Sequence, residues 1–145
     1  MKRVLFVCTG NRARSQMAEG LLRHLAGDRF QACSAGTEPK GVAHLTVEVM
    51  EEIGIDIRDQ RSQSVEEFVG ERFDYVITVC DSARERCPAF PGGGKRIHLS
   101  VEDPAEAEAR EEPSRQAFRA ARDDLRTRIE GFLQQEVVED GAARG

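Results

Sequence analysis

The sequence predicts an α/β fold, a single three-layer domain in which a four-stranded parallel sheet is flanked by helices. Short apolar runs typical of buried strands alternate along the chain with segments whose apolar residues recur at helical spacing. The length of 145 residues suits one domain, expected to span residues 1–135, with residues 136–145 as a flexible tail. In such a fold, ligands bind beyond the carboxyl ends of the strands.

The first half of the chain contains two strand–helix units. Residues 3–7 form an apolar, β-branched run that ends at Cys8. A helix is expected from Ser15 onward, because apolar side chains follow at helical spacing: Met17, Ala18, Leu21, Leu22 and Leu25. A second strand over residues 30–34 precedes a second helix over residues 42–53.

The second half of the chain repeats this pattern. Residues 73–79 form the strongest strand run, which also ends at a cysteine, Cys80. A fourth strand is expected over residues 96–99, followed by a long helix over residues 114–134 with one apolar stripe: Phe118, Ala121, Leu125, Ile129 and Phe132. Because parallel strands end at one edge of a sheet, Cys8 and Cys80 should both emerge at the functional edge.

Composition excludes several classes of function. A net charge of −5 argues against general binding to nucleic acid, which needs clustered cationic surface. The chain has no apolar run of the roughly 18 residues that span a bilayer, and residues 4–7 are too short for a secretion signal. We therefore expect a cytoplasmic protein without a membrane partner. In that reducing compartment, the four cysteines are expected to be catalytic, redox-active or metal-binding rather than a disulfide framework.

The segment from Cys8 to Arg14 has the composition of an oxyanion-binding loop. Between a strand and a helix, successive backbone N–H groups can line a nest for a tetrahedral oxyanion, here those of Thr9, Gly10, Asn11, Arg12 and Ala13. Gly10 lets the backbone turn, and the helix that follows adds positive dipole character. Arg14 can form bidentate bonds to two oxyanion oxygens.

The same surroundings suit Cys8 as a nucleophile. The helix dipole and the Arg14 guanidinium are expected to lower the pKa of Cys8, so that its thiolate is available at neutral pH. Ser15 could stabilise this thiolate by a hydrogen bond. The alternative is that Cys8 is a small buried hydrophobe and Arg14 a surface residue. The strand-to-helix context, together with Gly10 and Asn11, favours the catalytic interpretation.

The run from Val7 to Glu19, VCTGNRARSQMAE, resembles the anion loop of the low-molecular-weight protein tyrosine phosphatase superfamily. It is most similar to the loop of that superfamily's thioredoxin-coupled arsenate reductases, and Gln16 stands where the phosphatases usually carry Pro. The resemblance continues through residues 34–36, residues 54–57 and Asp103-Pro104, and covers nearly the whole chain. It implies an oxidoreductase that reduces arsenate to arsenite, with thioredoxin as the reductant.

The resemblance also implies a relay of three cysteines. Cys8 would attack arsenate, Cys80 would release arsenite by forming a disulfide with Cys8, and Cys87 would take over, leaving a Cys80–Cys87 disulfide for thioredoxin. If residues 80–87 were helical, the Cα atoms of the last two cysteines would lie about 10 Å apart, whereas a disulfide tolerates at most about 7 Å. The segment would then have to rearrange. Two alternatives stay open for these cysteines: a zinc site, although no Cys-x-x-Cys or Cys/His cluster accompanies them, and redundant buried thiols.

Two further expectations come from the resemblance. Asp103 matches the general acid that protonates the leaving oxygen, although on spacing alone it would belong to an acidic surface. No cofactor is required, but some reductases of this type hold potassium through Asn, Glu, Ser and Asp side chains. The first three are matched here, and the fourth position is Gln63, which lacks the charge. Bracing of the loop is therefore the alternative to potassium binding for Asn11, Glu19 and Ser34.

A phosphatase of the same superfamily is the alternative function, and it would hydrolyse phosphate monoesters through a Cys8 phosphoenzyme. That chemistry needs the anion loop and Asp103 but leaves Cys80 and Cys87 idle. Ala105 also stands where tyrosine phosphatases tend to carry Tyr. The sequence therefore favours arsenate reduction, with weak phosphatase activity as a side reaction because the first step is shared.

Overall fold

A computed structural model of the chain describes residues 1–104 and 115–144. Within these residues four strands form one sheet: β1 (Lys2–Cys8), β2 (Phe30–Gly36), β3 (Tyr75–Thr78) and β4 (Lys95–His98). The strand order is β2-β1-β3-β4, and each pair of neighbours is parallel. The predicted four-stranded parallel sheet is thus confirmed.

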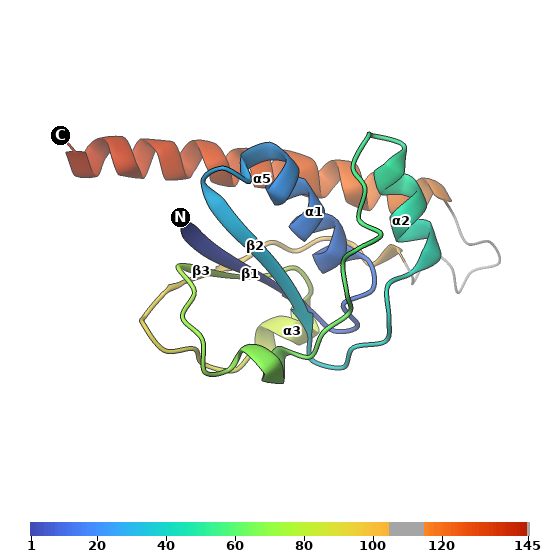
Figure 1. Cartoon of the computed structure of the whole chain (residues 1–145), viewed down its shortest axis with the longest axis horizontal. Helices are drawn as coiled ribbons and strands as arrows, with labels where there is room; N and C mark the ends of the chain where they lie inside the picture. Colours follow the sequence, from blue (N-terminus) through green and yellow to red (C-terminus); the bar gives the residue numbers. More distant parts are fainter. Residues whose placement is uncertain (105–114, 145) are drawn as a thin grey trace.

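The three main helices expected from the sequence are α1 (Arg14–Ala26), α2 (His44–Glu51) and α5 (Arg115–Arg144). Among the described residues, two shorter helices were not predicted. One is the 3-10 helix η1 (Val65–Phe68), which a capping box opens, and the other is α3 (Asp81–Arg86), directly after Cys80. Figure 1 shows α1 and α5 together on one side of the sheet and α3 on the other, which confirms the predicted three layers.

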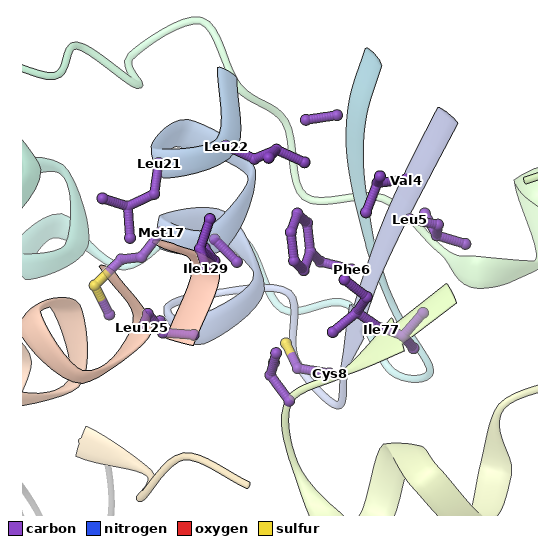
Figure 2. Packing of buried hydrophobic residues seen from close by; sticks show 14 of the residues in the cluster. Val4, Leu5, Phe6, Cys8, Met17, Leu21, Leu22, Ile77, Leu125 and Ile129 are labelled. Atoms are coloured by element: carbon purple, nitrogen blue, oxygen red, sulfur yellow. The ribbon is translucent and has the colours of Figure 1, made fainter. Parts of the chain in front are cut away.

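The core lies between the sheet and helices α1 and α5. Side chains alternate between the two faces of β1, so Phe6 points toward Leu22 of α1 and Ile129 of α5, whereas Leu5 points the other way (Figure 2). All four side chains are fully buried. Because β1 lies inside the sheet and both its faces are covered, its sequence is a continuous apolar run rather than an alternating one.

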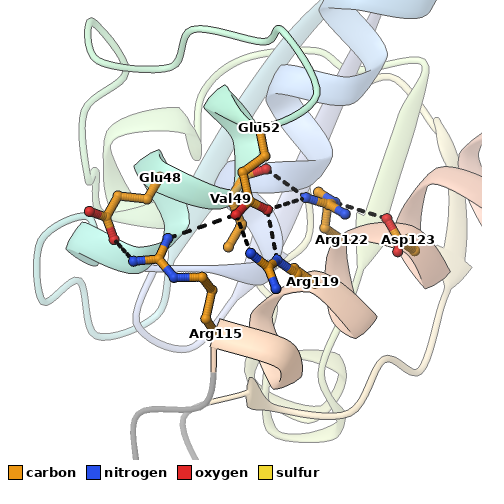
Figure 3. A network of polar contacts seen from close by, with 7 residues as sticks. All are labelled: Glu48, Val49, Glu52, Arg115, Arg119, Arg122 and Asp123. Atoms are coloured by element: carbon orange, nitrogen blue, oxygen red, sulfur yellow. Dashed lines mark hydrogen bonds and ion pairs between the residues drawn. The ribbon is translucent and has the colours of Figure 1, made fainter.

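Arginines of α5 form ion pairs with glutamates at the C-terminal end of α2 and hold this helix against the core (Figure 3). Glu52 accepts hydrogen bonds from Arg119 and Arg122, and Glu48 accepts one from Arg115. The Arg119 hydrogen bonds are the main cause that lowers the pKa of Glu52 to about 2. The charged residues of α5 therefore fix the position of α2, whose N-terminal end follows the loop segment that supports the anion site.

The sequence predicts a flexible tail over residues 136–145, whereas in the structure α5 continues through Arg144, the last residue that the structure describes. Glu136 explains the difference. Its side chain is buried, and its carboxylate accepts hydrogen bonds from the Tyr75 hydroxyl and the Lys2 ammonium. A polar residue in an acidic stretch thus anchors the helix to the sheet. No helix among the described residues has the length and apolar character needed to cross a membrane.

Replacing Glu136 with alanine is expected to destabilise the fold by about 1–3 kcal/mol, because the buried Tyr75 hydroxyl would lose its acceptor. Urea unfolding followed by circular dichroism measures the change. Glu130→Ala is the matched control, since the Glu130 side chain is 56% exposed on the same helix. Equal unfolding midpoints for the two variants would show that Glu136 does not anchor α5.

Candidate active site

The loop between β1 and α1 has its carbonyl groups turned outward. Four of them accept backbone hydrogen bonds from the segment after β2: Cys8 O from Thr37 N (3.1 Å), Thr9 O from Glu38 N (2.8 Å), Gly10 O from Lys40 N (2.9 Å) and Arg12 O from Ala43 N (3.0 Å). In a planar trans peptide unit the N–H points opposite to the C=O. The N–H groups that follow these carbonyls therefore point inward, as an oxyanion nest requires, and that of Asn11 donates to Cys8 Sγ at 3.2 Å.

Asn11 holds the loop in this shape. Its φ is 47°, in the left-handed region that Asn tolerates better than most residues. We expected Gly10 to supply the turn, but the left-handed residue is its neighbour. The Asn11 carboxamide is fully used: Nδ2 donates to Ser15 Oγ (2.7 Å) and Ser34 Oγ (3.0 Å), and Oδ1 accepts from Gln63 N (2.8 Å) and Gln16 Nε2 (3.0 Å).

Gly36 is a site residue that the sequence reasoning missed. It ends β2 and pairs with Cys8 across the sheet. A Cβ atom at this position would lie 2.6 Å from Thr9 O and 3.0 Å from Asn11 N, both backbone atoms that cannot move aside cheaply. Only glycine lets the loop pass this close to β2. The signal was present in the Ser34-Ala35-Gly36 run, which we had taken only as part of the family resemblance.

Cys8 lies at the centre of the loop and is buried, with its Sγ 2.7 Å from Ser15 Oγ. Burial raises the pKa of Cys8, and the hydrogen bonds from Ser15 and from the Asn11 N–H oppose this effect without cancelling it. The expected lowering of this pKa is therefore wrong for the structure as it stands. Burial is the largest cause of the shift, and Arg14 is not among the groups that oppose it.

The Arg14 guanidinium binds the loop after β4. Its Nη1 donates to Val101 O at 3.0 Å, and its Nη2 lies 3.4 Å from Asp103 Oδ2. The cation is thus paired with the residue predicted to be the general acid. Asp103 is partly exposed and Arg14 is largely covered, so this ion pair borders the site.

The loop opens into a cavity of about 600 Å³. Cys8, Arg14, Cys80 and Asp103 all line it, as do Thr9, Gly10 and Phe118. The thiol of Cys80 is 3.4 Å from Thr9 Oγ1 and is buried. The structure therefore brings together, at the carboxyl edge of the sheet, two thiols that are 72 positions apart in the sequence. Ala105, where tyrosine phosphatases tend to have Tyr, lies outside the described residues.

Cys87 is not part of this cavity. Cys80 caps the N-terminus of α3, where its Sγ accepts from Ala83 N at 3.4 Å, and Cys87 follows the C-terminal end of the same helix. The thiol of Cys87 is half-buried, and burial raises its pKa. All four cysteines are present as free thiols. Cys33 is a half-buried residue of β2 and does not line the cavity.

The residues considered for potassium lie together behind the loop, but as a chain of hydrogen bonds. Asn11 Nδ2 donates to Ser34 Oγ, and Ser34 Oγ donates to Glu19 Oε1 at 2.7 Å. Gln63 contributes its backbone N–H to Asn11 rather than a side-chain oxygen. Across residues 1–104 and 115–144, no group of three or more His, Cys, Asp and Glu side chains could hold a metal ion.

The loop and the sheet are those of a known family. Residues 3–143 match the model of the low molecular weight phosphotyrosine protein phosphatases. The chain belongs to this family. Within it, an arsenate reductase from Halalkalibacterium halodurans is 41% identical over 133 residues, which cover 92% of this chain and 96% of that protein.

Solved structures point to the same branch of the family. A structure of an arsenate reductase in its oxidized state has a TM-score of 0.78 and 32% identity, and the match covers 93% of this chain and 98% of the other. The thioredoxin-dependent arsenate reductase of Corynebacterium glutamicum has a TM-score of 0.70 and 26% identity, and the match covers 96% of this chain and 63% of that protein. The likeness in fold thus extends over almost the whole chain.

Proposed function

We propose that this protein reduces arsenate to arsenite, with thioredoxin as the electron donor. The observation that carries the proposal is the cavity shared by two buried thiols, Cys8 and Cys80. Hydrolysis of a phosphate ester uses one thiol, whereas a two-electron reduction uses two, because the electrons come from formation of a disulfide. The similarity to arsenate reductases supports this choice.

The first step is attack of the Cys8 thiolate on arsenic. One arsenate oxygen leaves as water, and Asp103 supplies the proton. The inward N–H groups of the loop hold the remaining oxygens, and Arg14 leaves Val101 and Asp103 to bind the oxyanion with two parallel hydrogen bonds. The same movement brings the guanidinium toward Cys8, which favours the thiolate, and frees Asp103 to act as an acid.

In the second step the Cys80 thiolate attacks Cys8 Sγ. A Cys8–Cys80 disulfide forms, the electron pair of the sulfur–arsenic bond stays on arsenic, and arsenic(V) becomes arsenic(III), which leaves as arsenite. The Cys87 thiolate then attacks Cys80 Sγ and releases Cys8 as a thiolate. The resulting Cys80–Cys87 disulfide takes two electrons and two protons from the thioredoxin dithiol.

The attack of Cys87 on Cys80, which is the third step, requires α3 to unwind. Cys80 and Cys87 flank the helix, and seven residue steps at the helical rise separate their Cα atoms by about 10 Å, which is more than the roughly 7 Å that a disulfide tolerates. Its six residues make α3 a single short helix, too short to be stable without tertiary contacts. Unwinding lets the half-buried Cys87 approach the buried Cys80.

A reducing cytoplasm and the thioredoxin system are the expected setting, because the relay needs all three thiols reduced before each turnover. The thioredoxin dependence of the similar Corynebacterium glutamicum enzyme supports this partner.

Phosphate-ester hydrolysis is the second candidate, because Cys8, Arg14 and Asp103 lie on one cavity and would serve either reaction. An aryl phosphate favours aromatic pocket walls, but the one tyrosine of the chain, Tyr75, is buried in β3 with its hydroxyl bonded to Glu136. We therefore expect hydrolysis only as a weak side activity.

A single turnover without thioredoxin tests the proposal. The reduced protein is mixed with an equal amount of arsenate, remaining thiols are alkylated, and the peptides are mapped by mass spectrometry. We expect one arsenite per chain, a disulfide between Cys80 and Cys87, and alkylated Cys8 and Cys33. The same treatment with phosphate is the control and should leave all four cysteines alkylated. If arsenate also leaves all four alkylated, the protein is not an arsenate reductase of this kind.

A further inference from the structure

A chain of side-chain hydrogen bonds leads from the surface of α1 to the nucleophile. Arg23 Nη2 donates to Glu19 Oε2 at 2.7 Å, and Ser34 Oγ donates to Glu19 Oε1 at 2.7 Å. Asn11 Nδ2 links Ser34 to Ser15, and Ser15 Oγ lies 2.7 Å from Cys8 Sγ. The Glu19 side chain is only 7% exposed, although no step proposed for the reaction uses it.

The hydrogen bonds of this chain can run in one direction only. An ionised carboxylate accepts and never donates, so the Ser34 hydroxyl must give its hydrogen to Glu19 and can only accept from Asn11. Gln63 N and Gln16 Nε2 donate to Asn11 Oδ1 and hold the carboxamide in the same orientation from its other side.

The consequence for the nucleophile follows from the donor count. Asn11 Nδ2 has two hydrogens, one for Ser34 Oγ and one for Ser15 Oγ. Ser15 is thereby an acceptor toward Asn11, and its own hydrogen is left for Cys8 Sγ. A hydroxyl that donates to sulfur stabilises the thiolate over the thiol.

These same contacts do not suit a potassium ion. Both Glu19 oxygens have a hydrogen-bond donor already, and Asn11 faces Ser34 with its NH₂ group rather than its oxygen. The positive charge beside Glu19 belongs to Arg23, whose guanidinium also donates to Ala32 O and to Gln60 Oε1. The carboxylate is therefore neutralised by the chain itself.

We propose that the Glu19–Arg23 ion pair is a positioning device for Cys8: Arg23 is a built-in counter-ion that takes the place of a bound cation, and Glu19, through Ser34, acts together with Gln63 and Gln16 to keep Asn11 in the orientation that makes Ser15 a donor to the nucleophile. The inference concerns the reactivity of Cys8 and holds whether the substrate is arsenate or a phosphate ester. If this inference fails, the proposed function is not affected, and if the proposed function fails, this inference is not affected.

The test is the rate at which iodoacetamide alkylates Cys8, followed on the Cys8 peptide by mass spectrometry across a range of pH. In Glu19→Gln the amide presents its oxygen to Arg23 and its NH₂ to Ser34, so the acceptor that orients the chain is lost. We expect alkylation at neutral pH to slow on the order of fivefold, the worth of about one hydrogen bond, with the rate profile shifted to higher pH. An effect of charge alone has the opposite sign, because removing a nearby negative charge favours a thiolate. An unchanged or faster rate would overturn the proposal.

Four further measurements complete the test. Glu130→Gln, the same change at an exposed position, should leave the rate unchanged, and Arg23→Lys should retain most of it because the charge is kept. If Glu19→Gln does not fold, Ser34→Ala breaks the same chain at a smaller side chain and carries the same expectation. The wild-type rate should be equal in potassium chloride and in choline chloride of the same ionic strength. A faster rate in potassium would show that a bound cation, and not Arg23, neutralises the Glu19 carboxylate.

Discussion

Replacing Cys8 with serine is expected to abolish arsenate reduction, with a loss of at least about a thousandfold, as for removal of other enzymatic nucleophiles. A serine hydroxyl is not ionised at neutral pH, and it cannot form the disulfide that supplies the electrons. The loop itself should survive, because Ser15 and the Asn11 N–H can hydrogen-bond to a hydroxyl at this position as they do to the thiol. Arsenite release in the presence of reduced thioredoxin measures the effect.

Cys33→Ser is the matched control for this substitution. Cys33 is a half-buried thiol of β2 that lies outside the cavity, so its replacement should leave turnover close to that of the wild type. Substantial arsenite release by Cys8→Ser would contradict the assignment of the nucleophile. Loss of activity in the control would mean that the relay includes a different thiol.

The sheet and the location of the loop could be predicted because both follow from local patterns. Buried parallel strands are continuous apolar runs, and two of these runs end at cysteines. Because parallel strands end at one edge of the sheet, this pattern predicts that Cys8 and Cys80 lie close together, as they do in the structure. The composition of the loop likewise indicated an oxyanion nest, and the outward carbonyls of the loop agree with it.

Contacts between distant segments could not be predicted in the same way. Glu136 is in an acidic stretch that looks solvated, yet its carboxylate accepts hydrogen bonds from Tyr75 and Lys2. The helix α5 accordingly continues past residue 134, where the sequence predicts its end. The pKa of Cys8 is raised mainly by burial, and Arg14 is held by Val101 and Asp103, in a loop almost 90 positions away. The spacing of residues along the chain does not indicate which distant group a polar side chain will contact.

The short helix α3 could not be predicted either, for a different reason. Its six residues, DSARER, have no apolar stripe, and only Ala83 is buried among them, so no helical period could be recognised. The helix exists because Cys80 caps it and because it packs against β1 and β3. This dependence on tertiary contacts is what allows the segment to rearrange during the relay.

Cys87→Ser is the substitution that separates the relay from a simpler reaction. The first two steps do not involve Cys87, so the variant should release one arsenite per chain and then stop with a Cys8–Cys80 disulfide. Thioredoxin cannot rescue it efficiently, because Cys8 and Cys80 are only 3% and 6% exposed. A phosphatase reaction would not be affected, since hydrolysis returns Cys8 without a second thiol.

The most direct measurement is arsenate-dependent oxidation of NADPH in the presence of thioredoxin and thioredoxin reductase, with wild type and Cys87→Ser compared. We predict sustained oxidation of NADPH by the wild type and only a background rate for the variant, because the electrons for its single arsenite come from Cys8 and Cys80 and the resulting disulfide is not reduced by thioredoxin. Hydrolysis of a phosphate ester, measured in parallel, should be equal in the two proteins. Sustained arsenate turnover by Cys87→Ser, or none by the wild type, would contradict the three-cysteine relay.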